Sequence, residues 1–278
     1  MTSLNRIPLA GVIGTPVAHS KSPRIFRHWL TRLGISGHYI PMDVAERDLE
    51  AAIRVLPRLG FVGVNVTIPH KEHVLEIADL VSDRAALTGS ANTLVFRDDG
   101  KIQADSTDGH GFMENLRSNV PDWDPAQGPA AILGAGGAAR AVVASLLDAG
   151  VEEIRLSNRT RARSEILGKD FGAKVRIHDW NEAGDTLKGA RTVVNATSLG
   201  MVGHERLQVP LRELSGDAVV TDLVYAPLET EFLAQARRIG CQTVDGLGML
   251  LFQAAPGFER WFGVAPHVDD QLRRAVLS

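Results

Sequence analysis

The chain has 278 residues, of which 44% are hydrophobic, and it carries 30 lysines and arginines against 33 aspartates and glutamates. This length exceeds the usual size of one hydrophobic core and favours two domains. The net charge of −3 provides no field that would hold nucleic acid or an anionic membrane, so a small molecule is the expected partner. No apolar run reaches the roughly 18 residues of a membrane span, and residues 1–8 lack the apolar core of a signal peptide.

The chain has a single cysteine, Cys241, which cannot form an internal disulfide or a thiolate metal cluster. This is typical of a reducing cytoplasm, where we expect the protein to work. It also disfavours the chemistry of zinc-dependent alcohol dehydrogenases. His19, His70 and His110 have no metal-ligand spacing with a partner, so we expect structural or solvent-exposed roles for them and no metal.

Short runs rich in Val, Ile, Leu and Thr alternate with stretches of about a dozen residues at helical period. This alternation predicts the α/β class with parallel sheets. Ser22 followed by Pro23 indicates a helix N-cap with proline in the first turn. In the first part we predict strands at residues 9–14, 38–43 and 63–68, helices at 23–33 and 48–59, and a hairpin of residues 93–96 and 101–104.

Residues 119–129 are rich in Pro, Gly and Asp and break any regular element, which makes them the best linker candidate. Beyond them the alternation restarts and predicts a doubly wound domain. The tail from Leu247 has a helical period that Pro256 and Pro266 punctuate. The expected strands are residues 130–133, 153–157, 174–178, 192–195 and 218–222, and the expected helices are 137–149 and 161–170.

A glycine-rich turn of the pattern G-x-G-x-x-A follows an apolar strand and opens a helix, as a dinucleotide fingerprint requires. In that interpretation Gly134 permits the tight turn and Gly136 lets the backbone approach a pyrophosphate. The alternative is an ordinary glycine-rich βα turn. The fingerprint consists of Gly134, Ala135, Gly136, Gly137, Ala138 and Ala139.

The end of the next strand predicts which nicotinamide cofactor is bound. A site for NAD usually places Asp or Glu there, to bind the ribose 2′-hydroxyl. Here Asn158 takes that position and Arg159, Thr160, Arg161 and Arg163 follow. No carboxylate repels a 2′-phosphate and a guanidinium can bind one bidentately, so we predict NADP. The alternative is a solvated basic helix start.

Polar clusters stand at the carboxyl ends of the strands predicted in the first part, where open α/β sheets gather ligands. They comprise residues 19–22, 65–67, 70–71, 92–93 and 106–108. Hydride transfer from an alcohol also requires removal of the hydroxyl proton, which makes Lys71 and Asp108 the candidate catalytic pair. From the residues alone, these two could equally be a surface lysine and a helix N-cap aspartate.

Four motifs in this region resemble, in order, those of the shikimate dehydrogenase family. They are Ser20-Lys21-Ser22-Pro23, the segment 65–71 (N-V-T-I-P-H-K), Ala91-Asn92-Thr93 and Thr107-Asp108-Gly109. The resemblance implies that Ser20 and Ser22 hold the substrate carboxylate. It further implies that Thr67 contacts the substrate, that Asn92 binds a ring hydroxyl, and that Lys71 and Asp108 form a catalytic pair.

The second part carries further motifs of that family. Asn158-Arg159-Thr160 resembles its clamp for the adenosine 2′-phosphate, and residues 195–198, 222–230 and 246–253 resemble three more of its segments. The resemblance implies that Tyr225 and Gln253 contact the substrate. It implies cofactor contacts for Gly134, Ala135, Gly136, Gly137, Ala138, Ala139, Asn158, Arg159, Thr160, Arg163, Thr197, Leu223, Gly246 and Met249.

The resemblance also implies a domain plan and an activity. Residues 1–118 would form a substrate-binding and catalytic α/β domain with a mainly parallel sheet, residues 119–246 a Rossmann-type NADP domain, and residues 247–278 helices returning to the first domain. The activity would be reversible reduction of 3-dehydroshikimate to shikimate by NADPH, in the shikimate pathway to chorismate and aromatic amino acids. The chain departs from the family pattern at Ser106, where Asn is common, and at Phe26-Arg27, where His and a small polar residue are common.

Two other functions compete with this one. A quinate/shikimate dehydrogenase would share the fold and the catalytic pair, but Ser22 and the clustered arginines argue against it. An NADP-binding regulator without catalysis would keep the fold, but intact Lys71 and Asp108 argue against that. The oligomeric state is open between a monomer and a homodimer, because no self-complementary apolar seam can be identified in the sequence.

Overall fold

The computed structural model describes residues 7–278 and divides the chain into two compact units. The first unit runs to Thr107 and includes Leu251–Ser278, and the second is Asp108–Leu250. The expected boundaries after residues 118 and 246 stay a prediction, and the first six residues of segment 1–118 lie outside the described residues. The expected boundary after residue 118 would leave nearly all of helix α5 (Asp108–Asn119) in the first domain. In the structure α5 packs on α6 (Gly137–Asp148) within the second unit.

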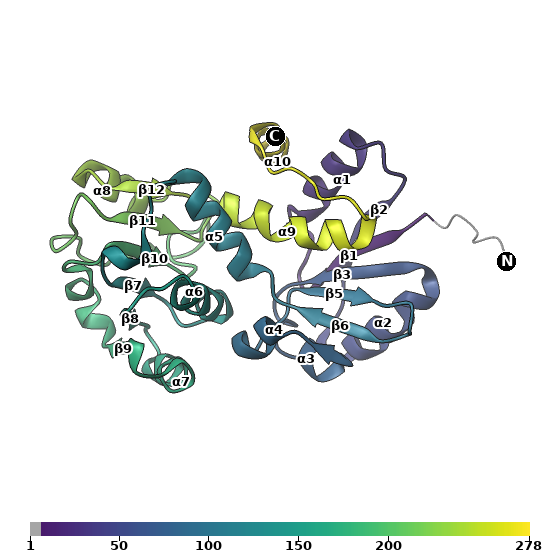
Figure 1. Cartoon of the computed structure of the whole chain (residues 1–278), viewed down its shortest axis with the longest axis horizontal. Coiled ribbons are helices and arrows are strands. Elements are labelled where there is room, and N and C mark those ends of the chain that lie inside the picture. Colours follow the sequence, from purple (N-terminus) through teal and green to yellow (C-terminus); the bar gives the residue numbers. More distant parts are fainter. Residues whose placement is uncertain (1–6) are drawn as a thin grey trace. The chain divides into compact units, whose positions relative to one another are not determined.

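The first unit contains a six-stranded sheet in the order β2-β1-β3-β5-β6-β4 (Figure 1). Strand β1 pairs in parallel with β2 and β3, whereas β5 is antiparallel to β3 and β6. The predicted hairpin is therefore confirmed. The strands are β1 (Leu9–Gly14), β2 (His38–Asp43), β3 (Phe61–Val66), β4 (Leu80–Val81), β5 (Thr93–Phe96) and β6 (Ile102–Asp105).

Two helices of the first unit differ from the sequence prediction. The predicted N-cap at Ser22 is wrong, because Lys21 is the N-cap and Ser22 is the first helical residue. The predicted helix 48–59 is α helical only to Val55, because Pro57 cannot donate the next backbone hydrogen bond and a 3-10 turn follows. The helices are α1 (Ser22–Arg32), α2 (Leu49–Val55), α3 (Val74–Ile77), α4 (Asp83–Thr88) and α10 (Asp270–Leu277), with 3-10 turns at Glu46–Asp48 and Leu56–Leu59.

Helix α9 (Leu247–Phe262) continues through Pro256, so the prediction that this proline interrupts the tail is wrong there. Packing on the sheet outweighs the lost hydrogen bond. The indole of Trp261 donates to the backbone oxygen of Leu94 at 3.1 Å. It lies so close to Gly63 that a Cβ added there would come within 2.0 Å of the indole nitrogen. Pro266 does fall between α9 and α10.

The second unit contains a fully parallel six-stranded sheet in the order β12-β11-β10-β7-β8-β9. Helices α7 and α8 and strand β12 complete it, and the sequence predicted neither α5, α8 nor β12. The elements are β7 (Ala130–Leu133), β8 (Ile154–Ser157), α7 (Arg161–Phe171), β9 (Val175–His178), β10 (Thr192–Asn195), β11 (Val219–Asp222), α8 (Glu231–Ile239) and β12 (Gln242–Val244), with 3-10 turns at Pro125–Gln127, Gly172–Lys174, Trp180–Glu182 and Asp185–Leu187.

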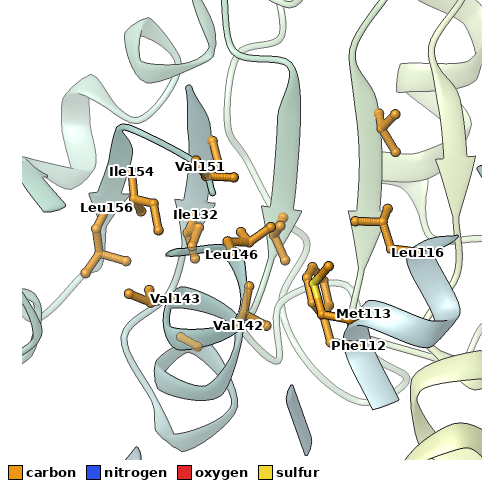
Figure 2. Packing of buried hydrophobic residues seen from close by; sticks show 14 of the residues in the cluster. Phe112, Met113, Leu116, Ile132, Val142, Val143, Leu146, Val151, Ile154 and Leu156 are labelled. Atoms are coloured by element: carbon orange, nitrogen blue, oxygen red, sulfur yellow. The ribbon is translucent and has the colours of Figure 1, made fainter. Parts of the chain in front are cut away.

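Apolar side chains cover both faces of this sheet. On one face, Val142, Val143 and Leu146 of α6 lie beside Ile132, Ile154 and Leu156 of β7 and β8, and α5 packs near β12 in the same buried cluster (Figure 2). On the other, Phe232 and Leu233 of α8 pack in a second buried cluster. This is the doubly wound arrangement that the sequence predicted. Among the helices within residues 7–278, none is long and apolar enough to cross a membrane.

Candidate active site

The polar residues predicted in the first unit gather at one edge of its sheet. Asn65 near the end of β3, Thr93 at the start of β5 and Asp105 at the end of β6 are partners in register. The residues next to them therefore share this edge, which explains why clusters far apart in sequence converge. The carboxyl edge of an open α/β sheet is where ligands bind.

Asn92 is the centre of this edge and is 2% exposed. Its Nδ2 donates to Gln253 Oε1 at 2.7 Å and to Thr107 Oγ1 at 2.9 Å, while its Oδ1 accepts from the backbone nitrogen of Thr107 at 2.8 Å. The Thr107 hydroxyl donates to the backbone oxygen of Gln253 at 2.8 Å. The structure thus joins two predicted site residues, Asn92 and Gln253. It adds Thr107, which sequence reasoning missed although it stands in the Thr107-Asp108-Gly109 motif.

The loop after β3 is tied to the same edge by backbone hydrogen bonds. The nitrogen of Ala91 donates to the oxygen of Lys71 at 2.8 Å, and the nitrogen of His70 donates to the oxygen of Thr67 at 3.0 Å. The His70 ring is 1% exposed, with Nε2 2.7 Å from the oxygen of Val44. His70 therefore holds the loop, and this agrees with the expected structural role.

A buried chain of hydrogen bonds connects Ser22 with Asn92. The Tyr39 hydroxyl donates to Asn65 Oδ1 at 2.7 Å, and Asn65 Nδ2 donates to the oxygen of Asn92 at 3.0 Å. Burial raises the pKa of Tyr39 well above its ordinary value, while a hydrogen bond with Ser22 opposes that rise. Phe26, one of the departures from the family pattern, stacks on the Tyr39 ring at 3.8 Å between centroids. Phe26 therefore fixes the first link of this chain.

Asp105 anchors Ser106, the other position at which the chain departs from the family pattern. The carboxylate is 1% exposed and accepts hydrogen bonds from Ser82, Arg84 and the backbone nitrogen of Ser106. Arg260 lies 2.6 Å away. Burial alone would raise the pKa of Asp105, but the hydrogen bonds of Ser82 and Arg260 and the charges of Arg260 and Arg84 outweigh it and lower the pKa. A charged aspartate therefore holds the backbone just before Thr107.

The predicted site residues are divided between the units. Ser20, Ser22, Thr67, Lys71, Asn92 and Gln253 belong to the first unit, whereas Asp108 and Tyr225 belong to the second. Asp108 is buried and begins α5 directly after Thr107, and Lys71 is half-buried. Burial raises the pKa of Tyr225.

In the second unit the ends of five strands align, since Leu133, Ser157, His178, Asn195 and Asp222 are register partners. The loops after these strands therefore share one edge. They contain the fingerprint turn, Asn158, Thr197, Leu223 and Tyr225. This single edge is the position at which doubly wound sheets bind dinucleotides.

The fingerprint turn has the geometry that a dinucleotide needs. Gly134 has φ +112°, and a Cβ there would come within 2.9 Å of Ala196 and Thr197. Gly136 and Gly137 are exposed, and a Cβ at either would meet nothing within 4 Å. The protein itself therefore does not require glycine at these two positions, whereas a pyrophosphate lying on the backbone would. The residues present fit the cofactor.

Asn158 connects this turn with the arginine-rich loop. Its Oδ1 accepts from the nitrogen of Ala135 at 3.2 Å, and its Nδ2 donates to the oxygen of Thr160 at 2.9 Å. Arg161 is already engaged by Glu165 and Asp179. Arg159 reaches Glu205 at 3.4 Å with both side chains largely exposed, a weak pairing, and Arg163 forms no ion pair within the described part of the chain. Arg159 and Arg163 are thus the arginines available to a phosphate.

Asp222 organises the two loops that follow β10 and β11, and sequence reasoning did not identify its role. Its carboxylate accepts from Asn195 Nδ2 at 2.9 Å, the nitrogen of Val224 at 2.9 Å and the Thr230 hydroxyl at 2.6 Å. Asn195 Oδ1 in turn accepts from the Thr197 hydroxyl at 2.7 Å. The available signal was that Asn195 and Asp222 end neighbouring parallel strands. Burial raises the pKa of Asp222 to about 6, against these hydrogen bonds.

Gly246 lies against the second of these loops, because a Cβ there would come within 2.3 Å of the backbone oxygen of Leu223. Met249 is buried in the core of the unit. Two predicted cofactor residues, Leu223 and Gly246, are thereby brought together.

Among residues 7–278, no three His, Cys, Asp or Glu side chains are arranged to hold a metal ion.

We predict that Asp222 makes stability depend on pH. Because its folded pKa is raised from 3.8 to about 6, its contribution is fully present below pH ~4 and lost as the pH rises through about 6. The free energy of unfolding should be measured in urea from pH 4 to 7 for the wild type and for Asp222→Asn. Relative to the variant, the wild type should lose roughly 2–3 kcal/mol of this free energy as the pH rises. Parallel profiles for the two proteins would contradict the raised pKa.

Comparison with known proteins identifies the family of the chain. Residues 12–94 match the family described as shikimate dehydrogenase substrate binding domain, and residues 117–224 match the family described as shikimate / quinate 5-dehydrogenase. A relative from Cereibacter sphaeroides, named shikimate dehydrogenase (NADP(+)), is 64% identical over the whole of both chains.

Two solved structures share the fold. Shikimate 5-dehydrogenase from Thermus thermophilus, in complex with NADP(H) and shikimate, is 34% identical with a TM-score of 0.87, covering 98% of this chain and 99% of that one. Quinate dehydrogenase from Corynebacterium glutamicum, in complex with NAD, is 31% identical with a TM-score of 0.90 at the same coverage. With two family matches along its length and a 64% identical relative, the chain belongs to the shikimate dehydrogenase family.

Proposed function

We propose that the chain catalyses the reversible reduction of 3-dehydroshikimate to shikimate with NADPH, a step toward chorismate and the aromatic amino acids. The observation that carries the proposal is the hydrogen-bonded cluster of Asn92, Thr107 and Gln253, to which the Lys71 loop is attached. The 64% identity to a relative named shikimate dehydrogenase (NADP(+)) supports this substrate and this cofactor.

In this proposal the first unit binds the ring through its hydroxyl and carboxylate groups. Ser20 and Ser22 stand at the start of α1, where the positive end of the helix dipole favours an anion, and they hold the substrate carboxylate. Asn92 and Gln253 face ring hydroxyls with amides whose positions their mutual hydrogen bond restricts. Thr67 completes the substrate contacts of the first unit, and Tyr225 would be the contact that the second unit adds.

Lys71 carries the proton transfer. As the ketone is reduced, its oxygen gains negative charge, and the Lys71 ammonium gives that oxygen a proton. Asp108 holds the ammonium and the neighbouring substrate hydroxyl in place. In the oxidative direction, the Lys71 amine removes the hydroxyl proton. When bound, NADPH supplies the hydride of the reduction.

The second unit would hold the cofactor with three groups of residues. The turn of Gly134, Ala135, Gly136, Gly137, Ala138 and Ala139 would hold the pyrophosphate at the start of α6. The adenosine 2′-phosphate would be bound by Asn158, Arg159, Thr160 and Arg163. The nicotinamide side would be lined by Thr197 and Leu223, on loops that Asp222 and Asn195 hold, and by Gly246 and Met249.

Quinate dehydrogenation is the second candidate, because the quinate dehydrogenase of Corynebacterium glutamicum has the same fold at a TM-score of 0.90. Fold likeness does not separate the two substrates, and we favour shikimate because of the 64% identical relative. For the oligomeric state, our prediction stays a monomer or a homodimer. We also propose a cytoplasmic location, which the single free thiol at Cys241 supports.

Side-by-side kinetics with shikimate and quinate, each with NADP and NAD, test the proposed function. We expect kcat/KM for shikimate with NADP to exceed each of the other three combinations by at least about tenfold, measured by absorbance of reduced nicotinamide. Equal or greater efficiency with quinate would assign the second candidate. NADPH binding without turnover of either substrate would assign a regulator.

Substitution of single arginines tests the cofactor clamp. Because each charge-assisted hydrogen bond to phosphate is strong, Arg159→Gln and Arg163→Gln should each raise the KM for NADPH by roughly tenfold and leave kinetics with NADH unchanged. Arg161→Gln is the matched control, since Glu165 and Asp179 already engage Arg161, and its effect should stay below about twofold. An equal loss with NADH, or an Arg161→Gln effect as large as the others, would contradict the assignment.

A further inference from the structure

A basic cavity lies between α1 and α10 in the first unit, outside the residues of the proposed function. Its volume is about 450 Å³, within the range of small-ligand sites. Helix α1 lines it with Arg24, Arg27, His28, Thr31 and Arg32, and α10 adds Gln271.

The two helices that form this cavity are fixed to one another. The Trp29 indole donates to the backbone oxygen of His267 at 2.9 Å, ahead of α10, and Arg32 pairs with Asp269 at 2.5 Å. Near the other end of α10, Lys21 Nζ donates to the oxygen of Val276 at 3.2 Å. The cavity is therefore held open between anchored helices.

The positive charge on α1 is not balanced by the protein. The helix carries Arg24, Arg27 and Arg32 and has no aspartate or glutamate between Ser22 and Arg32. Asp269 neutralises Arg32, but within residues 7–278 no carboxylate forms an ion pair with Arg24 or Arg27. Like charges one turn apart on a helix repel each other, and a cation near the N-terminus of a helix opposes its dipole. An anion in the cavity would relieve both effects.

A ring nitrogen of His28 is a second, independent observation in favour of an anion in the cavity. Its Nε2 is buried and has no hydrogen-bond partner in the described part of the chain. Buried polar atoms are hydrogen-bonded in the great majority of cases, so such an atom calls for a partner. Because His28 lines the cavity, a small rotation of its ring would let this nitrogen donate to a bound oxyanion. The Thr31 hydroxyl and the Gln271 amide are further donors on its lining.

We propose that this cavity binds a small metabolite carrying at least two negative charges, through phosphate or carboxylate groups. Guanidinium groups bind both kinds of oxyanion bidentately, which makes Arg24 and Arg27 the main ligands. The volume of the cavity suits a small molecule, and the net charge of −3 offers no field for a polyanion. The site is on the helix whose first turn contains Ser22, and it is distinct from the residues proposed to bind shikimate.

Isothermal titration calorimetry with inorganic pyrophosphate and with citrate tests this site. Saturating NADPH and shikimate should be present at constant ionic strength, so that the phosphate and carboxylate sites of the proposed function are filled. We expect one equivalent of at least one probe to bind with a Kd below about 1 mM. Pyrophosphate alone would indicate a phosphate ligand, and citrate alone a carboxylate ligand. No saturable binding of either probe overturns the proposal.

Variants decide whether that binding is in the cavity. Arg24→Gln combined with Arg27→Gln should weaken the bound probe by roughly 100-fold, about tenfold for each guanidinium. Gln271→Glu, which adds a carboxylate from the exposed face of α10, should weaken it by at least about tenfold. Arg58→Gln, an exposed arginine of the same unit, is the control and should bind within about twofold of the wild type. Unchanged affinity in the double variant overturns the proposal.

Discussion

The hydrogen bonds of the buried Asn92 amide are the constraint on which the first unit depends. A buried amide that lacks partners is costly, so Asn92 must keep Thr107 and Gln253 beside it. These partners come from the segment between β6 and α5 and from the middle of α9, which are distant in sequence. One requirement for satisfied polar groups thereby fixes the positions of three polar side chains at the edge where the proposed substrate binds.

The second unit meets the same requirement with a carboxylate. Asp222 accepts three hydrogen bonds at the end of β11, and Asn195 extends this network to Thr197. Burial opposes the charge strongly enough to raise the pKa of Asp222 to about 6. The loops proposed to contact the nicotinamide are therefore held by a group that is costly to bury. Groups that are unfavourable for stability are common at sites where they position residues for a ligand.

Periodicity and turn chemistry predicted the parts of the fold that depend on local sequence, such as the fingerprint turn and strands β1, β7 and β10. They failed where packing decides. Pro256 remains inside α9 because the helix is anchored by Trp261 on the sheet. Helix α8 was not predicted either. Its N-cap residue, Thr230, donates a hydrogen bond to Asp222. The Asn92 network joins residues up to 161 positions apart in sequence, so no local pattern could predict its partners.

The central claim is that Lys71 transfers the proton during reduction of the ketone, and Lys71→Ala tests it most directly. Turnover of shikimate should fall by at least roughly 100-fold, while calorimetry shows that shikimate still binds as in the wild type. Lys101→Ala, which removes an exposed lysine of the same unit, should leave turnover unchanged. Near-normal turnover in Lys71→Ala with unaltered binding of shikimate would contradict the account.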